Sequence, residues 1–197
     1  MHGAFCRHAL QMLIHFALTI TLFLFCLAVI YGAACDVQTF TIPNRVSYGL
    51  VGLFVVYAFL MWLNPPEIYF PQLHKSEFHI LPIAMNVFYG LVVFAFFFVF
   101  WRLGWVGGGD VKFVSAISLF MGLDHVLIFV VLMSIISLLM VFILKSLPNL
   151  SLLYLKRPLP HIILNLIAKV QQRTIPYGLP AAMAALILIP SVITNIY

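Results

Sequence analysis

Uncharged runs divide the chain into segments long enough to cross a membrane. Each of the five longest runs reaches the roughly 20 residues that an α-helix needs to span the hydrocarbon core. They cover residues 9–35, 46–66, 78–101, 125–144 and 174–197, and a shorter sixth run covers 113–123. The pattern predicts helices at 10–34, 45–63, 80–101, 109–123, 125–144 and 177–195.

The helix predicted at 109–123 is the shortest of the six. At 1.5 Å per residue it is about 22 Å long, whereas the hydrocarbon core is ~30 Å thick. Such a helix must thin the bilayer, or begin below the cytoplasmic surface with protein around it. A re-entrant hairpin is the alternative interpretation of this segment.

The composition excludes an ordinary soluble domain. The chain has 197 residues, of which 64% are hydrophobic and 8% are charged, and its mean hydropathy is +1.15. Soluble domains have a charged fraction of about 25%. We therefore predict an all-α polytopic membrane protein with six transmembrane helices, forming a single membrane-embedded domain over residues 1–197. The apolar run after Arg7 exceeds the ~7–15 residues of a signal-peptide core, so it is interpreted as a retained helix.

The net charge of +5 does not indicate nucleic-acid binding, because the basic residues are not clustered on a soluble face. Their positions along the chain instead predict how the protein is oriented in the membrane. If the N-terminus lies outside, only Arg7 and Lys75 of the ten Lys and Arg residues are outside, and the other eight face the cytoplasm. The positive-inside rule favours this arrangement, which also places the C-terminus outside. The loop 145–176 is then cytoplasmic, and its amphipathic stretch 161–173 is a candidate interfacial helix.

Two aspartates at helix ends are the candidate catalytic residues. The chain has only five acidic residues, and the predicted orientation places Asp36 and Asp110 on the same side of the membrane. An ionisable group at membrane depth is expensive, and its default interpretation is a functional site. Two carboxyl groups that meet can share one proton, as in aspartic proteases. We expect Asp36 and Asp110 to form such a pair, with the roles of acid and base left open between them.

Three glycines precede the second of these aspartates. Gly107, Gly108 and Gly109 remove all side chains from the approach to Asp110, which would let an extended substrate lie against the carboxyl group. Lys112 lies about 200° around a helix from Asp110. It is therefore interpreted as an anchor in the membrane interface, with a contact to an acidic substrate residue as the alternative.

The sequence Thr-Ile-Pro-Asn follows Asp36 at residues 41–44. Pro43 suits the first turn of the second helix. Asn44 and Arg45 come next, at the cytoplasmic edge of the membrane. These three residues are candidate substrate or interface contacts, and Arg45 shares with Lys112 the alternative of pairing with an acidic substrate residue.

The order of these motifs resembles that of the bacterial prepilin peptidases, or type IV leader peptidases. Asp36, the Ile-Pro-Asn sequence at 42–44, a helical hairpin and the Gly-Gly-Gly-Asp-Val-Lys sequence at 107–112 follow one another. The chain is most similar to the short form associated with tight-adherence (Flp-type) pili, and Ile-Pro-Tyr-Gly at 175–178 resembles the family's C-terminal segment. The resemblance implies an aspartyl endopeptidase of the bacterial cytoplasmic membrane, with Asp36 and Asp110 as its catalytic pair. Its substrates would be prepilins or pseudopilins, cut on the cytoplasmic side behind a short basic leader.

The cysteines depart from the pattern of the long family members. Those members carry paired C-x-x-C motifs in a cytoplasmic insert and also N-methylate the new N-terminus. Cys6, Cys26 and Cys35 form no C-x-x-C pair, and no H-E-x-x-H sequence of a zinc protease is present. The resemblance therefore implies peptidase activity without methylation, without a cofactor and without a metal.

Several alternative functions remain compatible with the sequence. Presenilin-like proteases share G-x-G-D, but their Pro-Ala-Leu element is replaced here by Gly-Leu-Pro-Ala at 178–181. An archaeal preflagellin peptidase is a closer relative. From another class, a small proton-coupled transporter or channel would use Asp36 and Asp110 as a proton relay, and a catalytically silent assembly subunit is the last alternative. The expected partners are a prepilin and the lipid bilayer, without nucleic acid, and the oligomeric state stays open.

Overall fold

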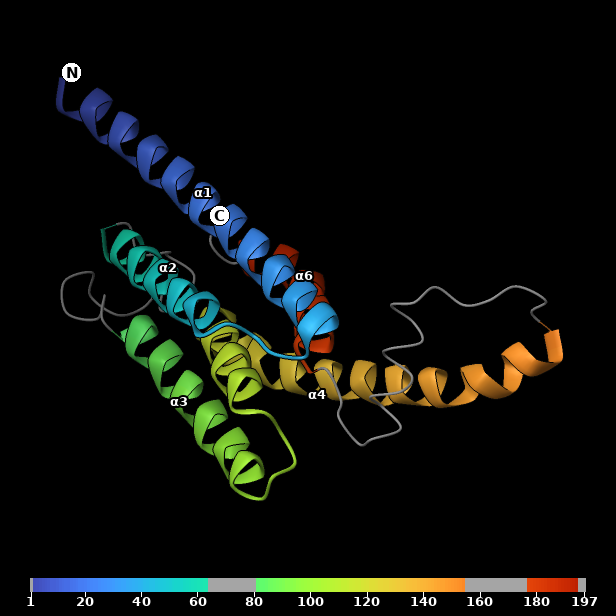
Figure 1. Ribbon diagram of the computed structural model, residues 1–197. Coiled ribbons are helices and arrows are strands. Elements are labelled where there is room, and N and C mark those ends of the chain that lie inside the picture. Colours follow the sequence, from blue (N-terminus) through green and yellow to red (C-terminus); the bar gives the residue numbers. More distant parts are fainter. Residues whose placement is uncertain (1, 64–80, 155–176, 195–197) are drawn as a thin grey trace.

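The chain forms a bundle of helices, seen in a computed structural model that describes residues 2–63, 81–154 and 177–194. The helices are α1 (His2–Thr39), α2 (Asn44–Leu63), α3 (Leu81–Arg102), α4 (Gly108–Tyr154) and α6 (Gly178–Thr194) (Figure 1). Because α4 consists of two helical segments that meet at Gly122, the described residues contain six helical segments, and they contain no strand. The predicted all-helical fold is confirmed, and each predicted helix has a counterpart.

Two helices extend beyond their predicted ends. α1 continues past residue 34 to Thr39 and so includes Asp36. α4 continues past residue 144 to Tyr154, so the first part of the predicted loop 145–176 is helical. The rest of that loop lies outside the described residues, as does the candidate interfacial helix 161–173.

The long helices have the length and composition of membrane spans. Four apolar stretches within the described residues are long enough to cross a bilayer, and they are His8–Thr39, Asn44–Leu63, Leu81–Arg102 and Asp124–Ser146. The apolar part of α6, Gly178–Ile193, is shorter. Large apolar side chains such as Phe59, Phe94 and Leu138 are exposed on these helices, as expected for surfaces that face lipid rather than water.

The first segment of α4 is surrounded by other helices. Almost all of its side chains are buried, including Val111, Phe113, Val114, Ser115, Ala116, Ile117, Ser118, Phe120 and Met121. This segment is too short to cross a bilayer by itself, and the structure shows protein around it, which is one of the two arrangements expected from its length. After Gly122 the second segment of α4 runs in another direction and extends away from the bundle towards Tyr154 (Figure 1).

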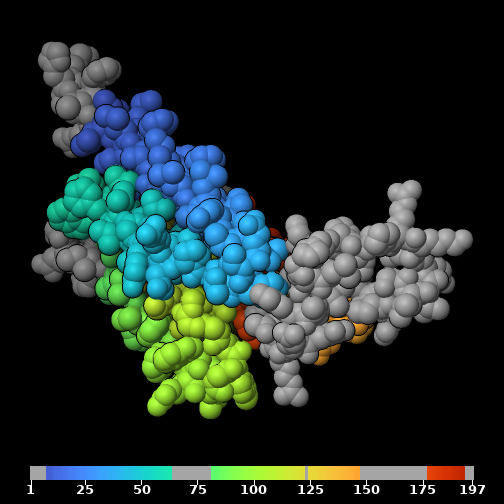
Figure 2. Space-filling model, in the orientation of Figure 1, coloured from blue at the N-terminus to red at the C-terminus, as the bar shows by residue number. Residues whose placement is uncertain are grey.

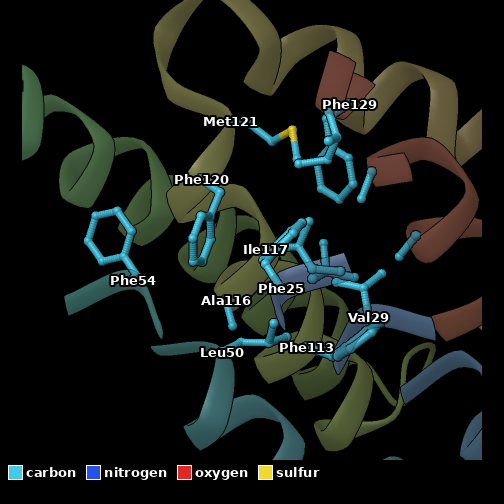
Figure 3. Close-up of a cluster of buried hydrophobic side chains, with 14 of the residues drawn as sticks. Phe25, Val29, Leu50, Phe54, Phe113, Ala116, Ile117, Phe120, Met121 and Phe129 are labelled. Atoms are coloured by element: carbon cyan, nitrogen blue, oxygen red, sulfur yellow. The ribbon is translucent and has the colours of Figure 1, made fainter. Parts of the chain in front are cut away.

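Phe120 joins the first segment of α4 to α1 and α2. Its ring centroid lies 4.3 Å from that of Phe25, 5.5 Å from that of Phe54 and 5.4 Å from that of Tyr57. Figure 3 shows this aromatic cluster next to the buried side chains of α1 and α4. Aromatic pairs at these separations add to the stabilisation from apolar burial, so the cluster holds α1, α2 and α4 in a defined arrangement.

Candidate active site

Asp36 lies on the last turn of α1 and is buried, with only 2% of its surface exposed. The helix ends just beyond it, where the Phe40 N–H donates to the Asp36 carbonyl oxygen and Phe40 adopts a φ of 55°. A residue in this left-handed conformation commonly terminates a helix. The backbone N–H of Gly178, the first residue of α6, donates to Oδ2 of Asp36 over 2.7 Å. The last turn of α1 is thereby joined to the start of α6.

Asp110 lies in the first turn of α4 and is half-buried. Its carboxyl group reaches back to Gly107, just before the helix, where a β-carbon would lie 2.8 Å from Oδ2 of Asp110, and the Val111 N–H donates to the Gly107 carbonyl oxygen. An acidic side chain that reaches back to the residue preceding its helix is a common N-terminal cap. The cap therefore sets the direction of the Asp110 side chain towards the 107–109 turn.

Ile42 brings the two aspartates into one site. A β-carbon placed at Gly109 would lie 3.2 Å from the Ile42 carbonyl oxygen, and one placed at Gly178 would lie 2.9 Å from Cδ1 of Ile42. The starts of α4 and α6 therefore both pack against this buried residue of the α1–α2 linker. Asp36 lies against Gly178 and Asp110 follows Gly109, so both aspartates lie near Ile42 and within electrostatic range of each other. That they form a catalytic pair stays a prediction.

The three glycines before Asp110 each face the protein itself. A β-carbon at Gly107 would lie 2.8 Å from Oδ2 of Asp110, and one at Gly108 would lie 3.1 Å from Nε1 of Trp101. Gly109 packs against the Ile42 backbone. Close packing within the chain is thus enough to explain why all three positions are glycine. The prediction that they let an extended substrate approach Asp110 stays a proposal.

The other candidate contacts lie at the rim of the site. The Lys112 Nζ donates to Oδ1 of Asn44 over 3.1 Å, and both side chains are exposed. This hydrogen bond joins the start of α2 to the start of α4. Pro43 and Arg45, on either side of Asn44, are also exposed. In Figure 2 the light-blue region where α1 leads into α2 lies directly next to the yellow-green region that leads into α4.

The sequence alone did not identify Gly178, Tyr177 or Ile42 as functional residues. They appeared only as members of the Ile-Pro-Asn and Ile-Pro-Tyr-Gly motifs. Burial raises the pKa of Tyr177, and the negative charge of Asp110 raises this pKa further. The phenol is therefore within electrostatic range of Asp110. The signal that points to this segment in the sequence is a glycine that opens a helix directly after the Pro-Tyr dipeptide at 176–177.

The described part of the chain contains no group of three or more His, Cys, Asp and Glu side chains able to hold a metal ion. The chemistry available at the meeting point of α1, α4 and α6 is that of a carboxyl pair. Such a pair can hold one proton, accept a proton from water and return one to a leaving group.

An all-helical membrane protein with two carboxyl groups close together at one end of its bundle has the architecture of a membrane-embedded peptidase. The model of the type IV leader peptidase family matches residues 22–142, a range that includes both Asp36 and Asp110. Because this match covers more than half of the chain, the protein belongs to the type IV leader peptidase family. Neither the curated proteins nor the solved structures contain a match to the chain.

Proposed function

We propose that this leader peptidase is an aspartyl endopeptidase in which Asp36 and Asp110 form the catalytic pair. The observation that supports the proposal is the packing of the starts of α4 and α6 against Ile42. Asp110 follows the first of these contacts, and Asp36 is hydrogen-bonded to Gly178 at the second. Two aspartates separated widely in the sequence would have no structural reason to meet at a membrane boundary, where ionisable groups are expensive.

The proposed substrates are prepilins or pseudopilins, including those of Flp-type pili, which carry a short basic leader. Cleavage occurs on the cytoplasmic side of the bacterial inner membrane, and both termini of the enzyme lie outside. The support for this orientation is the distribution of Lys and Arg along the chain. Residues 1–197 act as one membrane-embedded domain, without metal or cofactor. The glycines at 107–109 form one wall of the path along which the extended substrate reaches Asp110.

The proposed mechanism uses one proton held between two carboxyl groups. Two neighbouring carboxylates do not both ionise readily, so the pair carries one proton near neutral pH. The ionised carboxylate takes a proton from water as the water oxygen bonds to the scissile carbonyl carbon. The protonated partner gives its proton to the carbonyl oxygen, and the resulting tetrahedral species collapses when a proton passes to the leaving amine.

Neutralising either aspartate is the direct test of this mechanism. Asp36→Asn and Asp110→Asn should each lower the rate of prepilin cleavage by at least roughly a thousandfold, because neither half of an acid–base pair works alone. Cleavage is followed by the mobility shift of a co-expressed prepilin and by the mass of its new N-terminus. Asp124→Asn is the matched control, because Asp124 is exposed and begins the second segment of α4, and this variant should retain wild-type cleavage.

Near-normal cleavage by either catalytic variant would contradict the assignment of the pair. A transporter or channel would give a different result, in which both variants lose proton-coupled uptake or conductance and the wild-type protein cleaves no prepilin. Membrane insertion of all three variants, measured by fractionation, separates loss of chemistry from loss of protein.

The proposed product is a mature pilin with an unmodified N-terminal amine. The basis of this prediction is the absence from the sequence of the C-x-x-C pairs that accompany methylation in the long family members. Purified enzyme should therefore cleave without a methyl donor and in the presence of chelators. Intact-mass measurement of pilin processed with S-adenosylmethionine present checks this, and a mass gain of one methyl group would contradict it.

A further inference from the structure

Gly178 has no room for a side chain next to Asp36. A β-carbon at this position would lie 2.8 Å from Oδ2 of Asp36, 2.9 Å from Cβ of Asp36 and 2.9 Å from Cδ1 of Ile42. All three atoms belong to buried residues, so they have little freedom to move away. Only glycine lets the backbone of α6 approach the carboxyl group of Asp36 this closely.

This approach allows the start of α6 to hold the Asp36 carboxylate. The Gly178 N–H donates to Oδ2 of Asp36 over 2.7 Å. The first N–H groups of a helix have no acceptor within the helix, and the N-terminus carries a partial positive charge that favours an anion. Asp36 thus accepts a hydrogen bond from a group that can only donate.

The donor is held in place by the packing of α6. Ala181, Ala182, Ala184 and Ala185 are all buried, at 0–2% exposed surface. Small side chains let membrane helices approach closely, and α6 packs beside the C-terminal half of α1 (Figure 1). The position of the Gly178 N–H is therefore set by the bundle rather than by a loop.

We propose that Gly178 is a positioning residue that keeps Asp36 as the ionised member of the pair. Asp36 then takes the proton from the attacking water, and Asp110 carries the proton that goes to the scissile carbonyl oxygen. This inference rests on the proposed function, in which both aspartates are catalytic, and it assigns the roles that the sequence leaves open.

Two variants at position 178 test the inference. Gly178→Ala adds one carbon against Asp36. Replacement of Gly178 by glycolic acid, introduced by nonsense suppression, turns the 177–178 amide into an ester and deletes the N–H without adding a side chain. If the alanine variant fails to fold, the ester variant still tests the inference, because it adds no side chain. Gly49→Ala is the matched control, because no atom lies within 4 Å of a β-carbon at Gly49.

Both variants at 178 should lower kcat/KM for prepilin cleavage by roughly tenfold or more, because a small displacement of a catalytic group is costly. The acidic limb of the pH–rate profile should move to higher pH, since a carboxylate that has lost a hydrogen-bond donor is protonated more readily. A purely structural effect would lower the amount of active enzyme and leave the shape of the profile unchanged. Gly49→Ala should keep both the rate and the profile.

A wild-type rate and profile in the ester variant would overturn the inference, and so would a lower rate with an unshifted profile. Either result leaves the catalytic pair intact if Asp36→Asn and Asp110→Asn are inactive. Activity of Asp36→Asn would instead overturn the proposed function itself, so the two failures are distinguishable.

Discussion

The Ile42 side chain has no group that could take part in catalysis, yet Ile42 contacts or adjoins three parts of the site. Its backbone lies against Gly109, its side chain lies against Gly178, and it belongs to the linker that follows Asp36. Gly109 and Gly178 thus both contact one buried apolar residue. At the scale of single residues, the site is held together by close packing around Ile42 and by the hydrogen bond from Gly178 to Asp36.

Alanine substitutions in the 107–109 turn separate packing from substrate approach. A β-carbon at Gly109 meets backbone atoms of Ile42, whereas one at Gly108 meets the half-exposed side chain of Trp101, which can rotate away. Gly109→Ala should therefore lower kcat/KM by roughly tenfold, through displacement of Asp110, and Gly108→Ala should lower it less. Steady-state kinetics on purified variants checks the order. Equal losses, expressed mainly in KM, would indicate that the glycines serve the substrate instead.

The break in α4 is the main structural feature at the scale of elements. Gly122 has a φ of 62° and a ψ of −173°, a conformation that is essentially restricted to glycine. The break lets a short, buried segment carry Asp110 into the bundle, while the following segment, Asp124–Ser146, is long and apolar enough to cross the membrane. An unbroken helix would instead continue in the direction of the first segment.

Replacing Gly122 by alanine should destabilise the protein by about 1–3 kcal/mol, because a residue with a β-carbon is strained in this conformation. Thermal unfolding in detergent, followed by circular dichroism, measures the effect as a lower Tm. Gly52→Ala is the control, since Gly52 is helical and has no atom within 4 Å of an added β-carbon. That variant should be neutral or slightly more stable, given the higher helix propensity of alanine. An unchanged Tm for Gly122→Ala would contradict the strained break.

At the scale of the whole molecule, the helix ends that carry the site gather at one end of the bundle. The C-terminal ends of α1 and α3 and the N-terminal ends of α2, α4 and α6 lie there (Figure 1). This arrangement is the one expected if consecutive spans alternate in direction, and it brings the α1 turn with Asp36 and the α4 turn with Asp110 to the same end of the bundle.

Reporter fusions test which side that is. Fusions after Arg102 and within 150–170 should report the cytoplasm, and fusions within 66–76 and at the C-terminus should report the outside, because eight of the ten Lys and Arg residues then face the cytoplasm. Paired alkaline phosphatase and green fluorescent protein fusions provide opposite signals for the two compartments. A cytoplasmic signal from 66–76 would place both aspartates on the wrong side for prepilin cleavage.

The sequence by itself determined the positions of the helices and singled out the two aspartates as candidate site residues, because apolar length and the placement of charges are local properties of a chain. The predicted helices agree with the structure except at the ends of α1 and α4, where polar residues such as Asp36 and Lys145 continue a helix past its apolar run. Only the tertiary structure decided how the carboxyl groups are held. The hydrogen bond from Gly178 to Asp36 joins residues 142 positions apart, and the contacts of Ile42 join three helix ends. Such contacts depend on how closely the helices pack, which no local pattern of residues encodes.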